Sequence, residues 1–265
     1  MLELLILFLA LGVVAGLLAG TLGLGGGVVI VPALLMIFPL MDFPAAITAQ
    51  QAVATSLATI IVTSISAVHT HHRLGAIRWP VAWPMAAGIL LGAFAGAFLA
   101  SALPSATLAR LFGVFAMVVA VQMALSSRRP PATGPERLPA PPWLALAGGL
   151  IGTLSAIFGI GGGSMSVPFL SACRLKMQQA VAISAFCGLP IALGGVAGFI
   201  LAGWQHPALP AGSLGFVYLP AAAGIVLTSF PLARVGARLA HRLPATTLKR
   251  VFAGALFLIG LKLVL

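Results

Sequence analysis

Two glycine clusters hold the residues of this chain that are best suited to binding chemistry. Gly23 and Gly25–Gly27 interrupt one apolar stretch, and Gly159 and Gly161–Gly163 interrupt another. Glycine lets the chain turn sharply and lets another group approach the backbone. A short apolar segment follows each cluster, and its first N–H groups would be free and would carry the positive end of a helix dipole. Helix starts of this kind bind anions, so the clusters predict an anion site.

Neutral hydrogen-bonding side chains accompany both clusters. Gln51 and Ser56 begin the helix expected after the first cluster, Gln179 and Ser184 hold the matching positions in the second half, and Ser164 follows the second cluster. Such side chains can bind the oxygens of an oxyanion. The alternative is structural: tight helix packing for the glycines, and helix capping or interhelical hydrogen bonds for the polar side chains. The predicted substrate-binding residues are Gly25, Gly26, Gly27, Gln51, Ser56, Gly161, Gly162, Gly163, Ser164, Gln179 and Ser184.

Histidine and cysteine offer no comparable site. The segment 69–73, His-Thr-His-His-Arg, is interpreted as a solvated basic loop in preference to a metal site or a proton relay. Cys173 and Cys187 lie in apolar surroundings without the CxxC spacing of a metal or redox motif. No metal, cofactor or catalytic residue is therefore expected.

The composition places these residues in a membrane. Hydrophobic residues make up 61% of the 265 and charged residues only 6%, whereas a soluble domain is about one quarter charged. The mean hydropathy of +1.16 agrees. Only Glu3, Asp42 and Glu136 are acidic, which leaves no carboxylate pair for acid–base catalysis and no cage for Ca²⁺ or Mg²⁺. We therefore predict an integral membrane protein that is not an enzyme.

The apolar segments that must position the site are long enough to cross a bilayer, which takes about 20 residues. A short segment follows each glycine cluster, at 28–38 and at 164–172, and a polar, proline-rich linker separates the two halves at 127–142. The longer spans are predicted at residues 2–22, 47–68, 79–100, 106–126, 143–160, 177–202, 214–233 and 246–265.

Blocks of similar sequence recur in the same order in the two halves, at offsets between 128 and 140 residues. Such recurrence predicts two homologous membrane repeats, 1–126 and 143–265, with 127–142 as a cytoplasmic linker. The matched blocks are Gly23–Gly27 with Gly159–Gly163 (offset 136), Gln51–Ser56 with Gln179–Ser184 (offset 128), and Leu103–Pro104 with Leu243–Pro244 (offset 140).

The distribution of the +11 net charge predicts that the repeats are inverted. Basic residues lie in short loops, which argues against nucleic-acid binding, and positive loops face the cytoplasm. If each short segment returns to the side from which its helix came, the basic loops 69–78, 128–137, 174–176 and 234–242 all fall inside, and the loops poor in basic residues, 39–46, 101–106 and 203–213, fall outside. We therefore predict an all-α polytopic membrane protein of two inverted repeats, each with a Gly-broken helix pair and about three spanning helices.

The motif Gly23-x-Gly25-Gly26-Gly27-x-x-x-Val31-Pro32, its repeat at Gly159–Pro168, and the two Gln-Ala-Val-Ala-x-Ser blocks resemble the sulfite exporter TauE/SafE family. This family is also called the 4-toluene sulfonate uptake permease family. The resemblance covers nearly the whole chain. It implies a multi-pass permease of the bacterial inner membrane for sulfite, sulfoacetate, organosulfonates or related anions, whose substrate and direction differ between members.

We therefore expect a secondary transporter, in the first instance an exporter, of a small sulfur-containing oxyanion. Its site would lie at the midplane between the two broken helices, and one half would rock against the other. Alternatives are an anion channel or an uptake permease for another small anion at the same site, and a non-transporting assembly partner. The expected partners are the anion and membrane lipid, and a homo-oligomer is compatible with the sequence. No membrane-embedded Asp or Glu offers a conventional coupling site for H⁺ or Na⁺.

Overall fold

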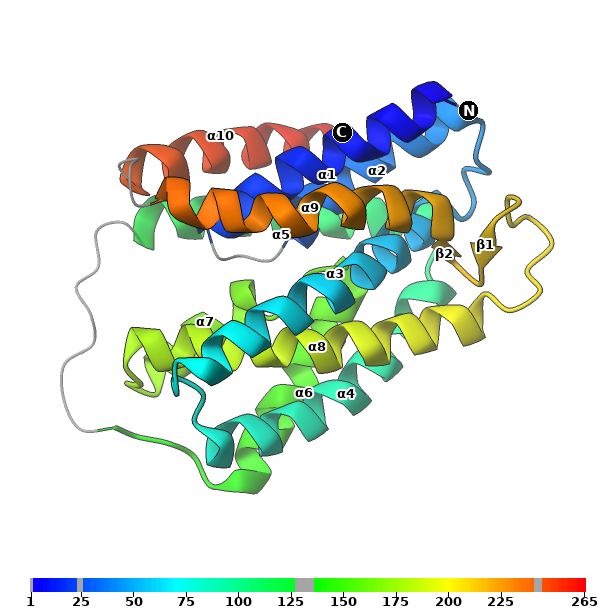
Figure 1. The fold of residues 1–265 in the computed structure, drawn as a ribbon. Coiled ribbons are helices and arrows are strands. Elements are labelled where there is room, and N and C mark those ends of the chain that lie inside the picture. The colour runs from blue at the N-terminus through cyan, green and yellow to red at the C-terminus, as the bar shows by residue number, and fades with distance from the viewer. Residues whose placement is uncertain (1, 23–25, 127–135, 241–244) are drawn as a thin grey trace.

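The computed structural model describes residues 2–22, 26–126, 136–240 and 245–265, and these form a helical bundle (Figure 1). In chain order the elements are α1 (Leu2–Leu22), α2 (Gly27–Ile37), the 3-10 helix η1 (Phe38–Met41), α3 (Thr48–Arg73), α4 (Trp79–Ala102), α5 (Ser105–Ser126), α6 (Pro141–Phe158), α7 (Gly163–Ala172), α8 (Met177–Ala202), β1 (Ser213–Leu214), β2 (Val217–Tyr218), α9 (Leu219–Ala240) and α10 (Ala245–Val264). Among the described residues, five helices are long and apolar enough to cross a membrane: α3, α4, α5, α6 and α8. The predicted fold class, an all-α polytopic membrane protein, is confirmed.

Both short helices turn back toward the end from which the preceding helix came. Phe8, early in α1, packs its ring on Tyr218 with centroids 6.2 Å apart, and Phe38, just after α2, packs on the same ring at 5.9 Å. In the second half, the N–H of Arg137, which precedes α6, donates to the carbonyl of Cys173, which follows α7. Each glycine break therefore lies between two helices that enter and leave at the same end.

Glycines bring helices from different halves into backbone contact. A Cβ added to Gly88 or Gly92 of α4 would overlap the backbone of α6, and one added to Gly12 or Gly16 of α1 would overlap that of α9. In both pairs, later residues of one helix face later residues of the other, so the helices run parallel. Small residues permit this approach between membrane helices. Because α1 and α6 hold matching places in the two halves, as α4 and α9 do, the two pairs are equivalent.

Helices α3 and α8 pack against each other at the centre in opposite directions. Leu57 meets Gly195 and Ser64 meets Gly188, so residue numbers fall along α8 as they rise along α3. Figure 1 shows that α4 and α9 also run in opposite directions. In these two pairs, helices that the predicted repeats match to each other point in opposite directions.

One end of the molecule, which we call the hairpin end, gathers the segments 38–47, 103–104 and 203–218. The side-chain amide of Gln50 donates to the carbonyl of Leu103 at 2.7 Å, and the N–H of Phe216 donates to the carbonyl of Phe199 at 3.3 Å. The first bond joins the start of α3 to the end of α4, and the second joins the segment 203–218 to the end of α8. Asp42 is the one charged residue described in these segments.

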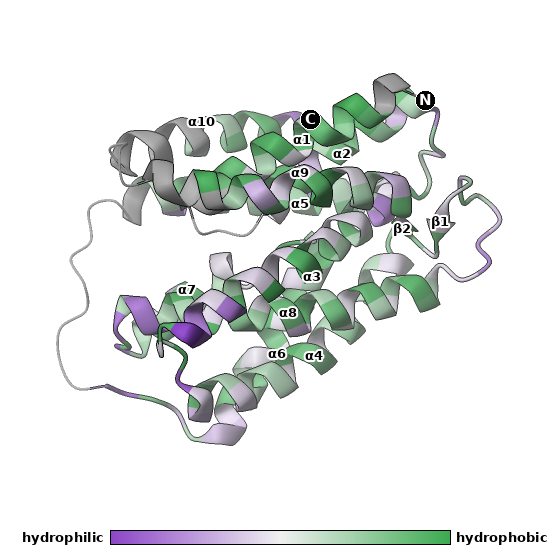
Figure 2. Cartoon of the chain, in the orientation of Figure 1, coloured by the Kyte–Doolittle hydropathy of each residue, from purple (hydrophilic) through white to green (hydrophobic). Residues whose placement is uncertain are grey.

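The opposite end, which we call the basic end, gathers the segments 73–78, 136–140 and 173–176. Arg78 pairs with Glu136, and Arg137 bonds to the residue after α7. This end carries Arg73, Arg78, Arg137, Arg174 and Lys176. Figure 2 shows hydrophilic residues concentrated where α3 and α7 end, on helices that are otherwise largely hydrophobic. The charge difference between the ends agrees with the rule that positive loops face the cytoplasm.

Three element boundaries differ from the prediction by five residues or more. The span expected to end at 233 continues as α9 to Ala240, through most of the expected loop 234–242. The segment 69–73, expected as a loop, forms the last turn of α3, where basic side chains meet the negative end of the helix dipole. The span expected from residue 214 begins instead at Leu219, after a two-stranded antiparallel hairpin. Gly212 and Gly215 take positive φ values of 87° and 53° there, which turn the chain before the helix starts.

Candidate functional site

The two glycine breaks meet at the centre of the molecule. Helix α6 ends at Gly159, whose φ of 64° is the left-handed conformation in which many helices terminate. A Cβ added to Gly27, the first residue of α2, would overlap the carbonyl oxygen of Gly159. The same carbonyl accepts a hydrogen bond from the hydroxyl of Ser56 at 2.8 Å. Glycine at position 27 is therefore required for the backbone at the first break to contact the backbone at the second.

Both helices that leave the breaks start without a side-chain cap. The N-cap residues are Gly26 for α2 and Gly162 for α7, and no side chain accepts a hydrogen bond at either. The first N–H groups of a helix have no intrahelical partner, and they concentrate partial positive charge. The breaks therefore supply two sets of hydrogen-bond donors from the backbone.

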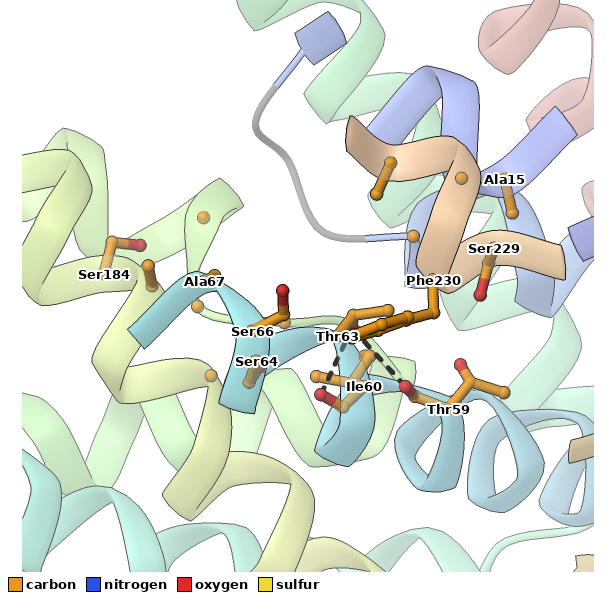
Figure 3. A pocket seen from close by; sticks show the side chains of 18 of the residues that line it. Ala15, Thr59, Ile60, Thr63, Ser64, Ser66, Ala67, Ser184, Ser229 and Phe230 are labelled. Atoms are coloured by element: carbon orange, nitrogen blue, oxygen red, sulfur yellow. Dashed lines mark hydrogen bonds between the residues drawn. The ribbon is translucent and has the colours of Figure 1, made fainter. Parts of the chain in front are cut away.

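A cavity of about 550 Å³ lies beside these helix starts, and Gly26 and Gly161–Gly163 form part of its wall. The other walls come from α1, α3, α8 and α9 (Figure 3). Along α3 the wall runs from Thr59 to His71, which is about 18 Å of helix. The cavity thus extends from the central break toward the basic end. Its volume is in the range that binds small molecules.

Hydroxyl groups from three helices line the cavity. Ser184 of α8 and Ser229 of α9 are each 2% exposed, and neither hydroxyl has a hydrogen-bond partner among the described residues. Figure 3 shows these two serines on opposite sides of the α3 segment that lines the cavity. A buried hydroxyl without a partner costs about 1–3 kcal/mol, which a ligand that accepts hydrogen bonds would offset. The α3 hydroxyls in the wall are Thr59, Thr63, Ser64, Ser66 and Thr70.

The wall of the cavity carries no lysine, arginine, aspartate or glutamate within the described residues, and His71 is its one titratable side chain there. Arg73 follows at the basic end, where it is exposed. In the described part of the chain, no group of three His, Cys, Asp or Glu residues could hold a metal ion. Besides the imidazole of His71, the donors available to a ligand are hydroxyls and backbone N–H groups, which favour an anion over a cation.

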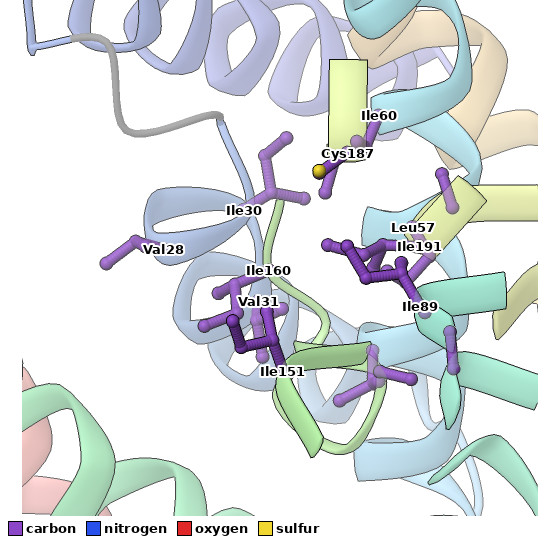
Figure 4. Packing of buried hydrophobic residues seen from close by; sticks show 14 of the residues in the cluster. Val28, Ile30, Val31, Leu57, Ile60, Ile89, Ile151, Ile160, Cys187 and Ile191 are labelled. Atoms are coloured by element: carbon purple, nitrogen blue, oxygen red, sulfur yellow. The ribbon is translucent and has the colours of Figure 1, made fainter. Parts of the chain in front are cut away.

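Packed side chains separate the cavity from the hairpin end. The N–H of Tyr218 donates to the hydroxyl of Thr55 at 3.0 Å, and the side-chain amide of Gln51 donates to Ser213 Oγ at 3.3 Å. The Tyr218 ring lies 5.0 Å from that of Phe43. Burial raises the pKa of the Tyr218 phenol above its ordinary value, at which the phenol is already neutral at pH 7. Buried aliphatic side chains fill the region between the helices nearby (Figure 4).

The predicted site residues occupy three kinds of place. Gly26, Gly161, Gly162, Gly163 and Ser184 line the cavity. Gly27 and Ser56 lie where the two breaks meet. The remaining ones are not in the cavity wall: Gln51 lies at the hairpin end, Gln179 is half-buried in the first turn of α8, Ser164 is buried in the first turn of α7, and Gly25 lies outside the described residues.

Several cavity hydroxyls were not among the predicted site residues. Thr59, Thr63, Ser66 and Thr70 recur at intervals of three or four, and so occupy one face of α3. A stripe of hydroxyls on an otherwise apolar helix is a periodic signal that can be read from sequence. Ser229 carries no such signal, because the residues three and four positions away on α9 are apolar and its repeat equivalent is Ile89.

Comparison with known proteins identifies the family of this chain. The family model described as sulfite exporter TauE/SafE matches residues 8–263. A probable membrane transporter protein of Haemophilus influenzae is 38% identical over 260 residues, which cover 98% of both chains. Probable membrane transporter proteins of Methanocaldococcus jannaschii and Bacillus subtilis are 27% and 25% identical, each over 98% of this chain and 95% and 97% of theirs. No solved structure matches. The chain therefore belongs to the sulfite exporter TauE/SafE family of multi-pass membrane transporters.

Proposed function

We propose that this transporter exports a small sulfur-containing oxyanion, either sulfite or an organosulfonate, by alternating access. The observation that carries the proposal is the central cavity, where two uncapped helix starts and two unpartnered serines meet without a carboxylate. The description of the matching family model as a sulfite exporter supports the substrate class and the direction.

The donors around the cavity suit an oxyanion. Sulfite and sulfonate groups carry several oxygens that accept hydrogen bonds in different directions. Ser184 and Ser229 approach from different helices, and the N–H groups at Gly162 and Gly163 come from the second break. Hydrogen bonds to a charged acceptor are stronger than neutral ones, and the helix starts add a favourable field. A cation would find no carboxylate in this wall to replace its water.

The cavity also has an apolar wall that suits an organic tail. Phe230 of α9, Ile30 of α2 and Val181 of α8 lie among the lining residues. A volume of about 550 Å³ is larger than a bare sulfite needs and leaves space for water or for a small organic group. An organosulfonate could therefore place its oxygens on the donors and its carbon skeleton on this wall.

Two features support a carrier over an anion channel. The cavity reaches toward the basic end, while the aromatic cluster and the bonds of Gln51 and Thr55 close the hairpin end. A conducting channel needs a continuous path, whereas a carrier opens at one end at a time. The opposite directions of matching helices support inverted repeats, an arrangement that lets two such states exchange.

Transport in proteoliposomes tests the proposal. Vesicles loaded with unlabelled sulfite should take up radiolabelled sulfite by counterflow, and protein-free vesicles measure the leak. Loss of counterflow in Ser184→Ala, with retention in Ser171→Ala, would place the function in the cavity, because Ser171 is another unpartnered hydroxyl outside it. Absence of flux with sulfite, sulfoacetate, thiosulfate and aryl sulfonates would refute the proposal. Anion current without counterflow would establish the channel instead.

A further inference from the structure

The internal repeat assigns each residue of the cavity wall an equivalent in the other half. The offset is 136 between α1 and α6, 128 between α3 and α8, and 140 between α4 and α9. Contacts agree with these offsets: a Cβ on Gly16 would overlap the backbone of Ser229, and one on Gly152, its equivalent, would overlap that of Ile89, the equivalent of Ser229. Equivalent positions therefore make equivalent contacts.

The equivalents of the cavity wall are closely packed. Thr63 and Ser64 line the cavity, but Ile191 and Ala192, which correspond to them, are both 0% exposed. Ile89 is also 0% exposed. Figure 4 shows Ile89 and Ile191 within one packed cluster, together with the equivalents of Ala15 and Ala185, which are Ile151 and Leu57. The cavity wall is therefore open, and the equivalent positions of the other repeat are closed.

The helix interfaces show the same difference. Ser66 and Thr70 of α3 line the cavity, as do Phe230 and Ala233 of α9, so the cavity lies between these two helices. Their equivalents on α8 are Gly194 and Gly198, and a Cβ on Gly198 would lie 2.7 Å from the Cβ of Ala97 on α4. We call this contact, made by Gly194 and Gly198 of α8 against α4, the glycine seam. It is closed where the equivalent α3–α9 interface is open.

One side chain on the closed side has no structural partner. Ser166 is 0% exposed, and its hydroxyl lacks a hydrogen-bond partner among the described residues. It is the equivalent of Ile30, which lines the open cavity. An unpartnered buried hydroxyl is unfavourable in the state described here, and it is accounted for if another state of the protein brings it to a ligand or to water.

We propose that the glycine seam opens in a second state and creates a cavity for the same anion, accessible from the hairpin end and lined by Ser166, Cys187, Ile191 and Ala192. The proposal rests on the proposed function, because it assigns the second half of the alternating-access cycle. The hydroxyls of α3 are replaced in this cavity by apolar side chains and glycine. Ser166 is then its main side-chain donor, so the second cavity holds the anion less tightly and releases it.

Cysteine accessibility tests the second cavity. In a Cys173→Ala, Cys187→Ala background, Ser64→Cys and Ala192→Cys are repeat equivalents that each change the side chain by little. Leu40→Cys and Leu74→Cys, exposed at 78% and 72%, mark the hairpin and basic ends. Ala116→Cys on α5, buried at 0%, is the matched control. A membrane-impermeant methanethiosulfonate reagent is applied from each side, with and without sulfite, and counterflow is measured on the same variants.

We expect Ala192→Cys to react from the side of Leu40→Cys, and Ser64→Cys from the side of Leu74→Cys. Sulfite should change the two rates in opposite directions, by about threefold or more, because it shifts the populations of the two states. Native Cys187, tested in the Cys173→Ala chain, should react from the same side as Ala192→Cys. This variant leaves every residue of the proposed second cavity unchanged.

The outcomes separate the two proposals. If counterflow is observed while Ala192→Cys and native Cys187 stay as unreactive as Ala116→Cys, the second cavity is overturned and the proposed function stands. Reactivity of Ala192→Cys from the hairpin side, with no flux of any sulfur anion, supports the cavity and overturns the substrate. Reactivity of Ala192→Cys from the basic side overturns the proposed direction of opening.

Discussion

Ser56 and Ser184 hold equivalent positions in the two repeats but have different surroundings. The Ser56 hydroxyl donates to the carbonyl of Gly159 at 2.8 Å, where the two glycine breaks meet. The Ser184 hydroxyl lines the cavity and has no partner among the described residues. We therefore predict that Ser56→Ala weakens the fold, whereas Ser184→Ala leaves the fold intact and weakens anion binding.

The magnitudes follow from these contacts. Ser56→Ala leaves the Gly159 carbonyl without its donor, which costs about 1–3 kcal/mol for a buried group. For a chain of this length the melting temperature falls by about 2–4 °C per kcal/mol, so we expect a decrease of about 2–12 °C. Ser184→Ala removes a hydroxyl that is already unpartnered, so its melting temperature should not fall. Its lost bond to a charged ligand is worth about 1.5–3 kcal/mol, which raises Kd by roughly 10- to 150-fold.

Thermal unfolding of the detergent-solubilised protein, followed by tryptophan fluorescence, measures both effects. Sulfite at about 100 times Kd should stabilise the wild type by about 2.7 kcal/mol, and at that concentration Ser184→Ala should retain only part of this shift. Ser171→Ala, which removes an unpartnered hydroxyl outside the cavity, should change neither quantity. Equal destabilisation by both repeat variants, or an unchanged sulfite shift in Ser184→Ala, would refute the division of roles.

Three further predictions concern the breaks, the topology and the hairpin end. Gly27→Ala should destabilise the protein by about 1–3 kcal/mol, because the added Cβ meets backbone atoms. In Gly26→Ala the added Cβ meets the end of the Ile30 side chain, so this variant should unfold like the wild type but bind sulfite less tightly. Equal melting temperatures for the two variants would contradict the contact between the breaks. In intact cells, an impermeant thiol reagent should label Leu40→Cys and spare Leu74→Cys, and the reverse pattern would invert the assigned topology. Tyr218→Ala should raise passive sulfite leak into proteoliposomes, and an unchanged leak would show that the aromatic cluster does not close the hairpin end.

Most of the architecture could be predicted because membrane helices follow local rules. Apolar length placed the spans, and the glycine clusters marked the breaks. The hairpin at 213–218 was not predicted, because two-residue strands leave no alternating pattern in the sequence. The helical state of 69–73 was missed because polarity in a membrane protein predicts exposure to water, and a helix can continue into water.

The site was harder to predict, because the sequence does not reveal where a side chain points. Gln51 and Gln179 are equivalent and polar, but neither lines the cavity. Ser56 and Ser184 are also equivalent, and only the second does. The proposed alternating access would account for this difference, because equivalent residues have unequal surroundings in each of its two states. A repeat in the sequence predicts the same role for two equivalent residues, so it does not reveal that their surroundings differ.

The absence of formally charged residues from the described cavity wall has an electrical consequence. An anion that crossed in such a cavity would carry its whole charge through the membrane field, because no lysine or arginine of the described wall would move with it to cancel that charge. A membrane potential that is negative inside then drives the loaded carrier outward by about 2.3 kcal/mol per charge for each 100 mV. Export of a sulfur anion would thus draw on the membrane voltage itself.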